Sequence, residues 1–267
     1  MTTTLPATSV DDLRQAIHLV RQAGRLAADA FDAPGRDLRR KPDGSELTPT
    51  DLAIEDLLRE QLHRHYPHDG VIGEERPPRT GTSGRRWIID PISGTGDFVH
   101  RVPLYSVDLA LEDRQGPALA VSGLPASRLV MAAGRGLGCW LLTGEQDLRQ
   151  ARRATVSDRA DLAGAVVCTH GLSAWPTELV SRLHARCRLR DGVHSIPRLI
   201  TGRADAVLVS GTPLGYEDLA CLPALVEESG GRVTDTSGRP VLDGDGTVLA
   251  TNGVLHADLL ALLAGLR

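Results

Sequence analysis

The sequence is poor in aromatic residues, has a single lysine and contains no long apolar run. Only 3% of its 267 residues are aromatic, whereas 41% are hydrophobic, so we expect a core built from Ala, Val, Leu and Ile. No run reaches the about 18 apolar residues that a membrane-spanning helix needs, and no signal peptide is recognisable. A cytoplasmic protein without a membrane partner is expected.

The cysteines and the net charge exclude two further classes of protein. The four cysteines, Cys139, Cys168, Cys187 and Cys221, show no CxxC spacing, which argues against a thiolate metal site or a redox motif. The formal net charge is −4, and one lysine, Lys41, stands among many arginines. Nothing in this distribution forms the basic field that a nucleic acid polymer would require.

The length allows one large domain or two halves that share an interface. The pattern predicts an N-terminal half over residues 1–123 and a C-terminal half over residues 124–267. Helices are predicted at about 9–33, 48–62, 175–189, 195–201 and 218–229. Strands are predicted at 71–72, 87–89, 106–111, 118–121, 129–133, 139–142, 166–168 and 206–209. Residues 41–44 predict a hairpin tip or a mobile loop.

The most informative stretch is residues 87–98, which read WIIDPISGTGDF. The apolar run predicts a short buried strand that delivers Asp90 at its end, where Pro91 stops the strand. Gly94 and Gly96 leave the next backbone free of side chains. A carboxylate beside such a turn can hold a hard cation and an anionic phosphate together. Taken alone, a strand followed by Asp-Pro more often simply marks the end of the strand and has no function.

Other acids occur at similar positions and also have simple structural explanations. Glu74 and Glu75 end an apolar strand, although adjacent acids usually form a solvated surface. Thr48 predicts a helix cap, which would explain Asp51 in the first turn of the helix. Asp218 also opens a predicted helix. A chemical role for these acids therefore depends on whether they act together.

Together these motifs resemble the inositol monophosphatase family. The resemblance rests on Gly73-Glu74-Glu75, on the stretch 87–100, and on Glu217-Asp218-Leu219-Ala220 followed by Glu228-Ser229-Gly230-Gly231, and it runs from about Leu13 to Leu262. Members are magnesium-dependent, lithium-sensitive phosphomonoesterases. The resemblance implies an α/β fold, a layered α-β-α-β-α sandwich of the inositol monophosphatase/sugar phosphatase type, and a homodimer.

The resemblance also implies two metal sites. Glu74, Asp90 and the Ile92 carbonyl would hold one ion, and Asp90 and Asp218 a second. These are hard oxygen ligands with no His or Cys cluster, which favours Mg²⁺, with Mn²⁺ as an alternative, over zinc. Ser93 departs from this pattern, because the family has a second Asp there and a hydroxyl is a weak ligand for Mg²⁺.

For catalysis, the resemblance implies a water molecule activated by Glu74 and Thr95, with Asp51 beside the metals. Phosphate and substrate would be bound by Ser93, Gly94, Thr95 and Lys41, although a solvated turn also explains Lys41. Two hypotheses follow. The chain hydrolyses a small phosphate monoester, such as an inositol, histidinol, sugar or nucleotide phosphate. Alternatively, it is a metal-impaired relative that binds a phosphorylated ligand or is recruited to a different reaction.

Overall fold

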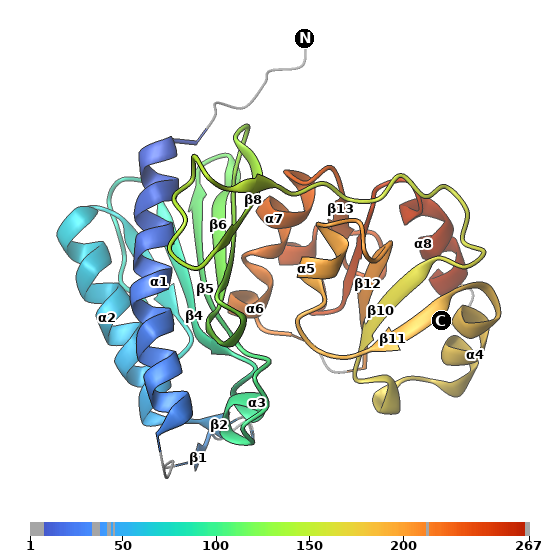
Figure 1. Cartoon of the computed structure of the whole chain (residues 1–267), viewed down its shortest axis with the longest axis horizontal. Coiled ribbons are helices and arrows are strands. Elements are labelled where there is room, and N and C mark those ends of the chain that lie inside the picture. The colour runs from blue at the N-terminus through green and yellow to red at the C-terminus, as the bar shows by residue number, and fades with distance from the viewer. Residues whose placement is uncertain (1–7, 34–37, 42–43, 45, 212–213, 265–267) are drawn as a thin grey trace. The chain divides into compact units, whose positions relative to one another are not determined.

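The structure, a computed structural model, describes residues 8–33, 38–41, 44, 46–211 and 214–264 (Figure 1). The chain divides between Arg152 and Arg153 into two compact units, called unit 1 and unit 2 below. The sequence pattern placed this division about 30 residues earlier, between 123 and 124. The reason for the difference is that three further strands after residue 124 continue the N-terminal sheet in series, the last of them at residues 152–153.

Unit 1 is built on a seven-stranded sheet of order β3-β4-β5-β6-β7-β8-β9, together with a two-stranded hairpin, β1-β2. Its strands are β1 (Arg39–Arg40), β2 (Glu46–Leu47), β3 (Gly70–Gly73), β4 (Arg86–Ser93), β5 (Ser106–Asp113), β6 (Gly116–Leu124), β7 (Leu129–Gly134), β8 (Gly138–Thr143) and β9 (Arg152–Arg153). Its helices are α1 (Val10–Asp32), α2 (Pro49–His65), α3 (Thr95–Val99) and the short 3₁₀ helix η1 (Pro125–Ser127). The hairpin agrees with the prediction for residues 41–44, of which 42 and 43 lie outside the described residues.

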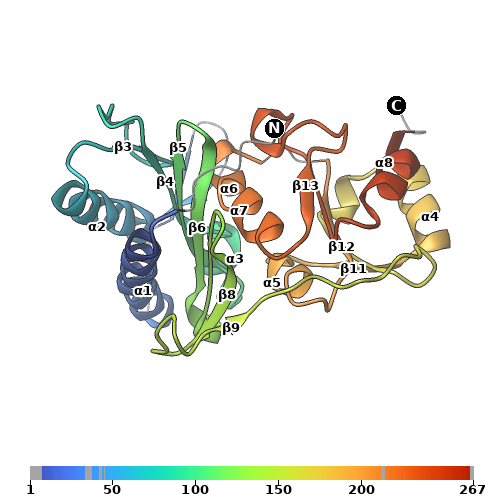
Figure 2. The ribbon, with the colours of Figure 1, turned by 90° about the horizontal axis from the view of Figure 1, so that it is seen from above.

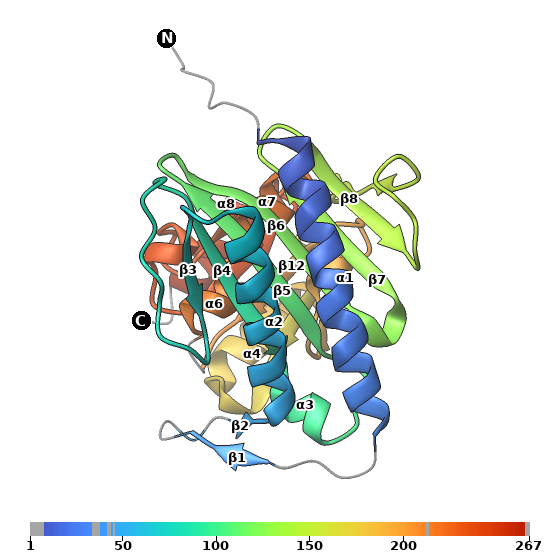
Figure 3. The ribbon, with the colours of Figure 1, turned by 90° about the vertical axis from the view of Figure 1, so that its left-hand side faces the viewer.

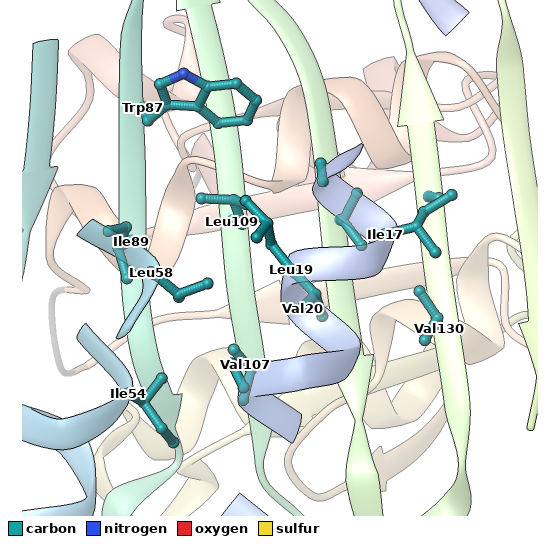
Figure 4. Packing of buried hydrophobic residues seen from close by; sticks show 14 of the residues in the cluster. Ile17, Leu19, Val20, Ile54, Leu58, Trp87, Ile89, Val107, Leu109 and Val130 are labelled. Carbon is teal, nitrogen blue, oxygen red and sulfur yellow. The ribbon is translucent and has the colours of Figure 1, made fainter. Parts of the chain in front are cut away.

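Helices α1 and α2 pack on one face of this sheet (Figure 3). Their apolar stripes meet alternate residues of the strands, because successive side chains of a strand point to opposite faces. Trp87 and Ile89 of β4 and Leu109 of β5 contact this layer (Figure 4). The resulting core is aliphatic apart from a few rings, as the composition predicted.

Helix α2 begins as the sequence predicted. Thr48 is its N-cap and Pro49 its first residue, and Thr48 and Asp51 form a reciprocal capping box. The apolar stripe of the helix, which includes Ile54, Leu58 and Leu62, is fully buried. Asp51 and Glu55 lie on the same stripe and are also buried. An amphipathic helix thus carries two carboxylates into the interior of unit 1.

Strand β4 is longer than predicted, because Pro91 does not end it. The ladder to β5 pairs Asp90 with Asp108 and Ser93 with Ser106, and the register shifts between these pairs. Between these pairs, two residues of β4 therefore oppose the single residue Val107 of β5, and this arrangement is a β-bulge. Proline lacks the N–H that a regular ladder would use, and a bulge is a position where that N–H is not needed. The strand continues to Ser93 and bends at Asp90.

Unit 2 is a mixed five-stranded sheet of order β11-β10-β12-β14-β13. The strands are β10 (Val166–His170), β11 (Arg188–Asp191), β12 (Ala206–Val209), β13 (Arg232–Thr234) and β14 (Val248–Thr251). The helices are η2 (Leu172–Ala174), α4 (Thr177–Arg186), α5 (Ile196–Leu199), α6 (Tyr216–Leu219), α7 (Leu222–Glu227), η3 (Val241–Asp243) and α8 (His256–Ala264). The central strands β12 and β14 are buried on both faces, with α4 and α8 on one face of the sheet and α5, α6 and α7 on the other (Figure 2), whereas the edge strand β11 is mostly exposed.

Two predicted helices of unit 2 are wrong in extent. The helix predicted to reach residue 189 ends at Arg186, and the next residues form β11, which pairs in parallel with β10. The helix predicted over 218–229 is divided into α6 and α7. Pro223 explains the division, because it has no N–H to offer the carbonyl of Leu219 one turn earlier. No helix in the described ranges is long and apolar enough to cross a membrane.

Candidate active site

Two acids that the sequence singled out lie near each other on neighbouring strands, one just after β3 and one within β4. Strands β3 and β4 run parallel, and their register pairs Gly73 with Ile89. Glu74 directly follows β3, whereas Asp90 lies within β4, and the register brings the two acids close together at the β3 edge of the sheet. Asp90 is 1% exposed and lies at the bulge of β4. This edge of unit 1 is where the sequence predicted the first metal ion.

Asp51 reaches the same region from the start of α2. Its Oδ2 accepts hydrogen bonds from the backbone N–H of Thr48 at 2.8 Å and from the Thr48 hydroxyl at 2.5 Å. Its Oδ1 lies 3.5 Å from Thr95 Oγ1, a long contact. Thr95 Oγ1 donates at 2.9 Å to the carbonyl of Ile92. Asp51 and Thr95, two of the three predicted catalytic residues, are therefore neighbours, and Thr95 is anchored to a predicted metal ligand.

The third predicted catalytic residue, Glu74, is paired with a cation. Lys41 Nζ lies 2.6 Å from Glu74 Oε1 and 2.5 Å from Glu75 Oε1. The Lys41 side chain is largely buried in this contact, so it is not the solvated turn residue that the sequence also allowed. The structure places Lys41 on the two acids, and no contact of Lys41 identifies a substrate. Its predicted role in binding substrate stays a prediction.

The surroundings of these acids change their pKa values. Burial raises the pKa of Glu75 to about 7, against the lowering effect of Lys41, and the negative charges of Glu74 and Asp51 raise it further. Burial also raises the pKa of Asp51, and Glu74 adds to this shift, although the hydrogen bonds from Thr48 oppose it. For Lys41, burial alone would lower the pKa, but Glu74 and Glu75 raise it above its ordinary value. Carboxylates that resist ionisation, clustered around a cation, are typical of functional sites.

The turn after β4 has the backbone that the glycines predicted. Gly94 adopts the left-handed conformation, with φ of 86°, and precedes α3. Ser93 is half-buried at the end of β4. The first N–H groups of a helix have no partner within that helix, so the backbone of Gly94 and Thr95 suits the predicted phosphate contact. That contact stays a prediction.

Asp218 is the one predicted metal ligand in unit 2. It lies in the first turn of α6, where its Oδ2 accepts the N–H of Gly215 at 2.9 Å. Such a contact is the ordinary one for a first-turn acid. The predicted role of Asp218 at a metal ion stays a prediction.

Sequence reasoning missed Glu55. Its side chain is fully buried, and it accepts hydrogen bonds from the backbone N–H groups of Glu75 at 2.7 Å and Arg76 at 3.1 Å. The available signal was its place four residues after Asp51 on the apolar stripe of α2. An acid on such a stripe must find polar partners inside the protein.

Comparisons with known proteins agree with this description. The model of the inositol monophosphatase family matches residues 9–266. A histidinol-phosphatase of Mycobacterium tuberculosis is 32% identical over 260 residues, covering 96% of this chain and 98% of that protein. An inositol-1-monophosphatase of Mesorhizobium japonicum is 30% identical over 255 residues, covering 93% and 94%. The solved structure of an inositol monophosphatase (IMPase) from Thermotoga maritima has a TM-score of 0.83 at 25% identity, covering 96% of this chain and 98% of that one.

These matches and the fold define a phosphomonoesterase. The chain belongs to the inositol monophosphatase family. The predicted α/β fold of that family is thereby confirmed. No finding favours the alternative of a metal-impaired relative.

The family is generally metal-dependent, and the donors in unit 1 suit a hard divalent cation. Glu74, Asp90 and the Ile92 carbonyl offer only oxygen, which is the donor that Mg²⁺ prefers. The ammonium of Lys41 on Glu74 shows that this edge already attracts positive charge. In the part of the chain that the structure describes, no three His, Cys, Asp or Glu side chains are grouped to hold a metal. Of the three carboxylates predicted to bind metal, Glu74 and Asp90 belong to unit 1 and Asp218 belongs to unit 2.

Proposed function

We propose that the chain hydrolyses a small phosphorylated alcohol with Mg²⁺ as its cofactor, and that Mn²⁺ can replace Mg²⁺. The observation that supports this proposal is the parallel register of β3 and β4, which pairs Gly73 with Ile89, the residues directly before Glu74 and Asp90. Glu74, Asp90 and the Ile92 carbonyl would hold one ion, and Asp90 and Asp218 a second. When bound, the ions would neutralise phosphate oxygens and lower the pKa of a water molecule.

The residues of the chain have separate tasks in this reaction. Glu74 would accept the proton of the attacking water, because its carboxylate lies at the sheet edge and is partly open to solvent. Thr95 would orient that water through its hydroxyl, which the Ile92 carbonyl and Asp51 hold in place. Asp51 itself is buried and would act on the hydroxyl rather than on the substrate.

Phosphate would be held by the turn after β4. The backbone N–H groups of Gly94 and Thr95 would donate to its oxygens, and the Ser93 hydroxyl would add a neutral contact. Lys41, whose ammonium contacts Glu74 and Glu75, would add a positive charge beside the phosphate. Hydrolysis by water needs no covalent phosphoenzyme, and among the described residues we identify no serine or cysteine arranged as an activated nucleophile.

The names of the relatives suggest substrates for testing. Histidinol phosphate and inositol 1-phosphate are the first candidates, and sugar and nucleotide monophosphates complete the panel. The measurement is release of inorganic phosphate by the purified chain at several Mg²⁺ concentrations, with EDTA as control. We expect one class of monoester to be hydrolysed and EDTA to abolish the reaction. Absence of phosphate release from every monoester at millimolar Mg²⁺ would overturn the proposal.

Three further predictions follow from the family resemblance. We propose that unit 1 supplies most of the metal-binding residues, that unit 2 supplies Asp218 and substrate contacts, and that the chain acts as a cytoplasmic homodimer. Light scattering of the purified protein measures its mass directly, and a monomeric mass would contradict the dimer.

A further inference from the structure

We infer that Glu55 is a positioning residue for Glu74. Its buried carboxylate holds the turn formed by residues 73–76, and this turn decides which of the two adjacent acids faces the site. The inference rests on the proposed function, because it assigns a supporting part to the same site. It concerns a residue that touches neither substrate nor metal and acts only through the backbone.

The contacts of Glu55 converge on this one turn. Glu55 Oε2 accepts the N–H of Glu75 at 2.7 Å, and Oε1 accepts the N–H of Arg76 at 3.1 Å. Arg59, one turn later on α2, donates from Nε to Oε1 at 2.7 Å. Both oxygens of a fully buried carboxylate are thus occupied by charged or backbone donors. Such charge-assisted hydrogen bonds are stronger than neutral ones, so the turn is held firmly against α2.

Gly73 shows how closely the turn approaches Glu55. A Cβ built on Gly73 would lie 2.1 Å from Glu55 Oε1 and 2.4 Å from its carboxyl carbon. No side chain larger than hydrogen fits there unless Glu55 moves. The glycine of the Gly-Glu-Glu motif is therefore explained by the carboxylate behind it, which the backbone of β3 must pass at contact distance.

The turn gives the two acids different exposures. Glu75, whose N–H is held by Glu55, has a side chain that is 4% exposed, whereas the Glu74 side chain is 33% exposed. Residues 74–76 lie beyond β3, and both carboxylates reach the ammonium of Lys41, so the backbone of this turn sets how far each acid is exposed. By fixing the backbone at Glu75 and Arg76, Glu55 keeps Glu74 directed to the sheet edge beside Asp90. If the backbone of this turn shifted by one residue, Glu75 would take the exposed position of Glu74.

The experiment compares Glu55→Gln with Gly73→Ala and with a matched control. Glu55→Gln keeps the shape of the side chain but replaces one accepting oxygen by an NH₂ group, which faces other donors. Gly73→Ala keeps Glu55 and its charge but displaces it. The control is Asp56→Asn, which removes the neighbouring acid of α2 that pairs on the surface with the side chain of Arg76. Circular dichroism verifies that each variant is folded.

Two quantities are measured for each protein, the Mg²⁺ dissociation constant by calorimetry and kcat at saturating Mg²⁺. Loss of a residue that orients a metal ligand costs about 10–100-fold in metal affinity or activity. We expect both Glu55→Gln and Gly73→Ala to weaken Mg²⁺ binding by about tenfold and to lower kcat by a similar factor. KM should stay within about twofold, since the turn does not contact substrate. Asp56→Asn should match the wild type.

A purely structural role for Glu55 predicts another result. The melting temperature would fall, but Mg²⁺ affinity and kcat per folded molecule would stay at the wild-type values, and this result would overturn the inference. Equal losses in Asp56→Asn would also overturn it. If Glu55→Gln does not fold, Gly73→Ala decides by the same two measurements. Failure of the proposed function is separate, because the wild type would then release no phosphate, while calorimetry would still compare Mg²⁺ binding.

Discussion

Asp51 in unit 1 and Asp235 in unit 2 are equally buried, at 0% exposure, yet their pKa values shift in opposite directions. Burial raises the pKa of Asp51, and the nearby charge of Glu74 adds to it. Burial would also raise the pKa of Asp235, but the backbone and side chain of Arg239 and the N–H of Ser237 donate to it and lower it instead. Asp235 has a guanidinium partner, whereas Asp51 has only neutral donors and lies near another acid, and this difference separates a carboxylate paired within unit 2 from one beside the candidate site.

The same contrast extends to the other buried polar groups of the two units. In unit 1 Glu74 and Glu75 share the ammonium of Lys41, and the charge of Asp51 also acts on Glu75. In unit 2 the buried imidazole of His256 is held between two threonine hydroxyls. Changes at these acids of unit 1 should therefore alter chemistry more than stability, and a change at His256 of unit 2 should do the reverse.

Asp90→Asn should give the largest effect. The substitution keeps the volume of a side chain at the bulge of β4 but removes the charge that would serve both metal ions. Losing several kcal/mol of charge stabilisation lowers the rate by about 10³-fold or more. The measurement is kcat of the purified variant at saturating Mg²⁺, with its circular dichroism spectrum as control. Near-normal turnover in a folded Asp90→Asn protein would place the site elsewhere.

Glu74→Gln should lower kcat by about 10²-fold, the lower end of what a general base contributes. Because Glu74 acts on water and metal rather than on the organic part of the substrate, KM should change little. Steady-state kinetics on the best monoester separate the two parameters. A raised KM with unchanged kcat would remove Glu74 from its catalytic task and assign it to substrate binding.

Local patterns predicted the parts of the site that depend on neighbours in sequence. Thr48, Pro49 and Asp51 form the predicted helix start, because capping involves residues within one turn. The position of Glu74 at the end of β3 was also recognisable, since it follows an apolar run. In these cases the interactions that form the structure involve residues close in sequence, and sequence patterns can therefore predict them.

The remaining features depend on contacts between distant segments. Pro91 continues β4 because the ladder to β5 shifts there, and a shift of register cannot be derived from β4 alone. Glu55 finds its donors on a turn 20 residues away. Lys41 contacts Glu74 although the two residues are 33 positions apart in the sequence. Sequence periodicity indicates which side chains are buried, but the partners of a buried charge come from tertiary packing.

Ser93→Asp tests the departure of this chain from the family pattern and should have a moderate effect. Ser93 is half-buried at the end of β4, three residues after Asp90. An acid there would add a carboxylate to a site with few of them, and Coulomb attraction worth about 1.4 kcal/mol tightens Mg²⁺ binding about tenfold. Hydrolysis should rise at low Mg²⁺ and gain less at saturation. The measurement is initial phosphate release against Mg²⁺ concentration for both proteins.

Two outcomes of that titration carry different meanings. An unchanged Mg²⁺ dependence would reject the view that Ser93 replaces a missing ligand. Weaker binding would indicate that another acid, such as Asp97 or Glu217, already compensates and that a further carboxylate repels it.

The smallest effect on catalysis is expected for His256→Gln in unit 2, which should alter the pH dependence of stability and leave kcat at pH 7.5 unchanged. His256 is 1% exposed. The hydroxyl of Thr234 donates to the carbonyl of Asp235, so its oxygen is available to accept from His256 Nε2 at 3.0 Å. Nδ1 then accepts from the hydroxyl of Thr251 at 3.0 Å. The neutral ring satisfies both contacts.

Protonation of His256 would disrupt this arrangement, and stability should therefore fall in acid. Burial, followed by the charge of Arg232, lowers the pKa of His256 from 6.5 to about 4. Above pH 6.5 both the folded and the unfolded states hold a neutral ring, so the free energy of unfolding does not depend on this group. Between pH 6.5 and 4 the unfolded state binds a proton that the folded state does not, so stability decreases as pH falls, by about 3 kcal/mol in total. Urea unfolding at pH 7.5, 6, 5 and 4.5 should show this decrease in the wild type and a shallower one in His256→Gln. Parallel pH profiles would show that the imidazole does not control the acid stability of unit 2.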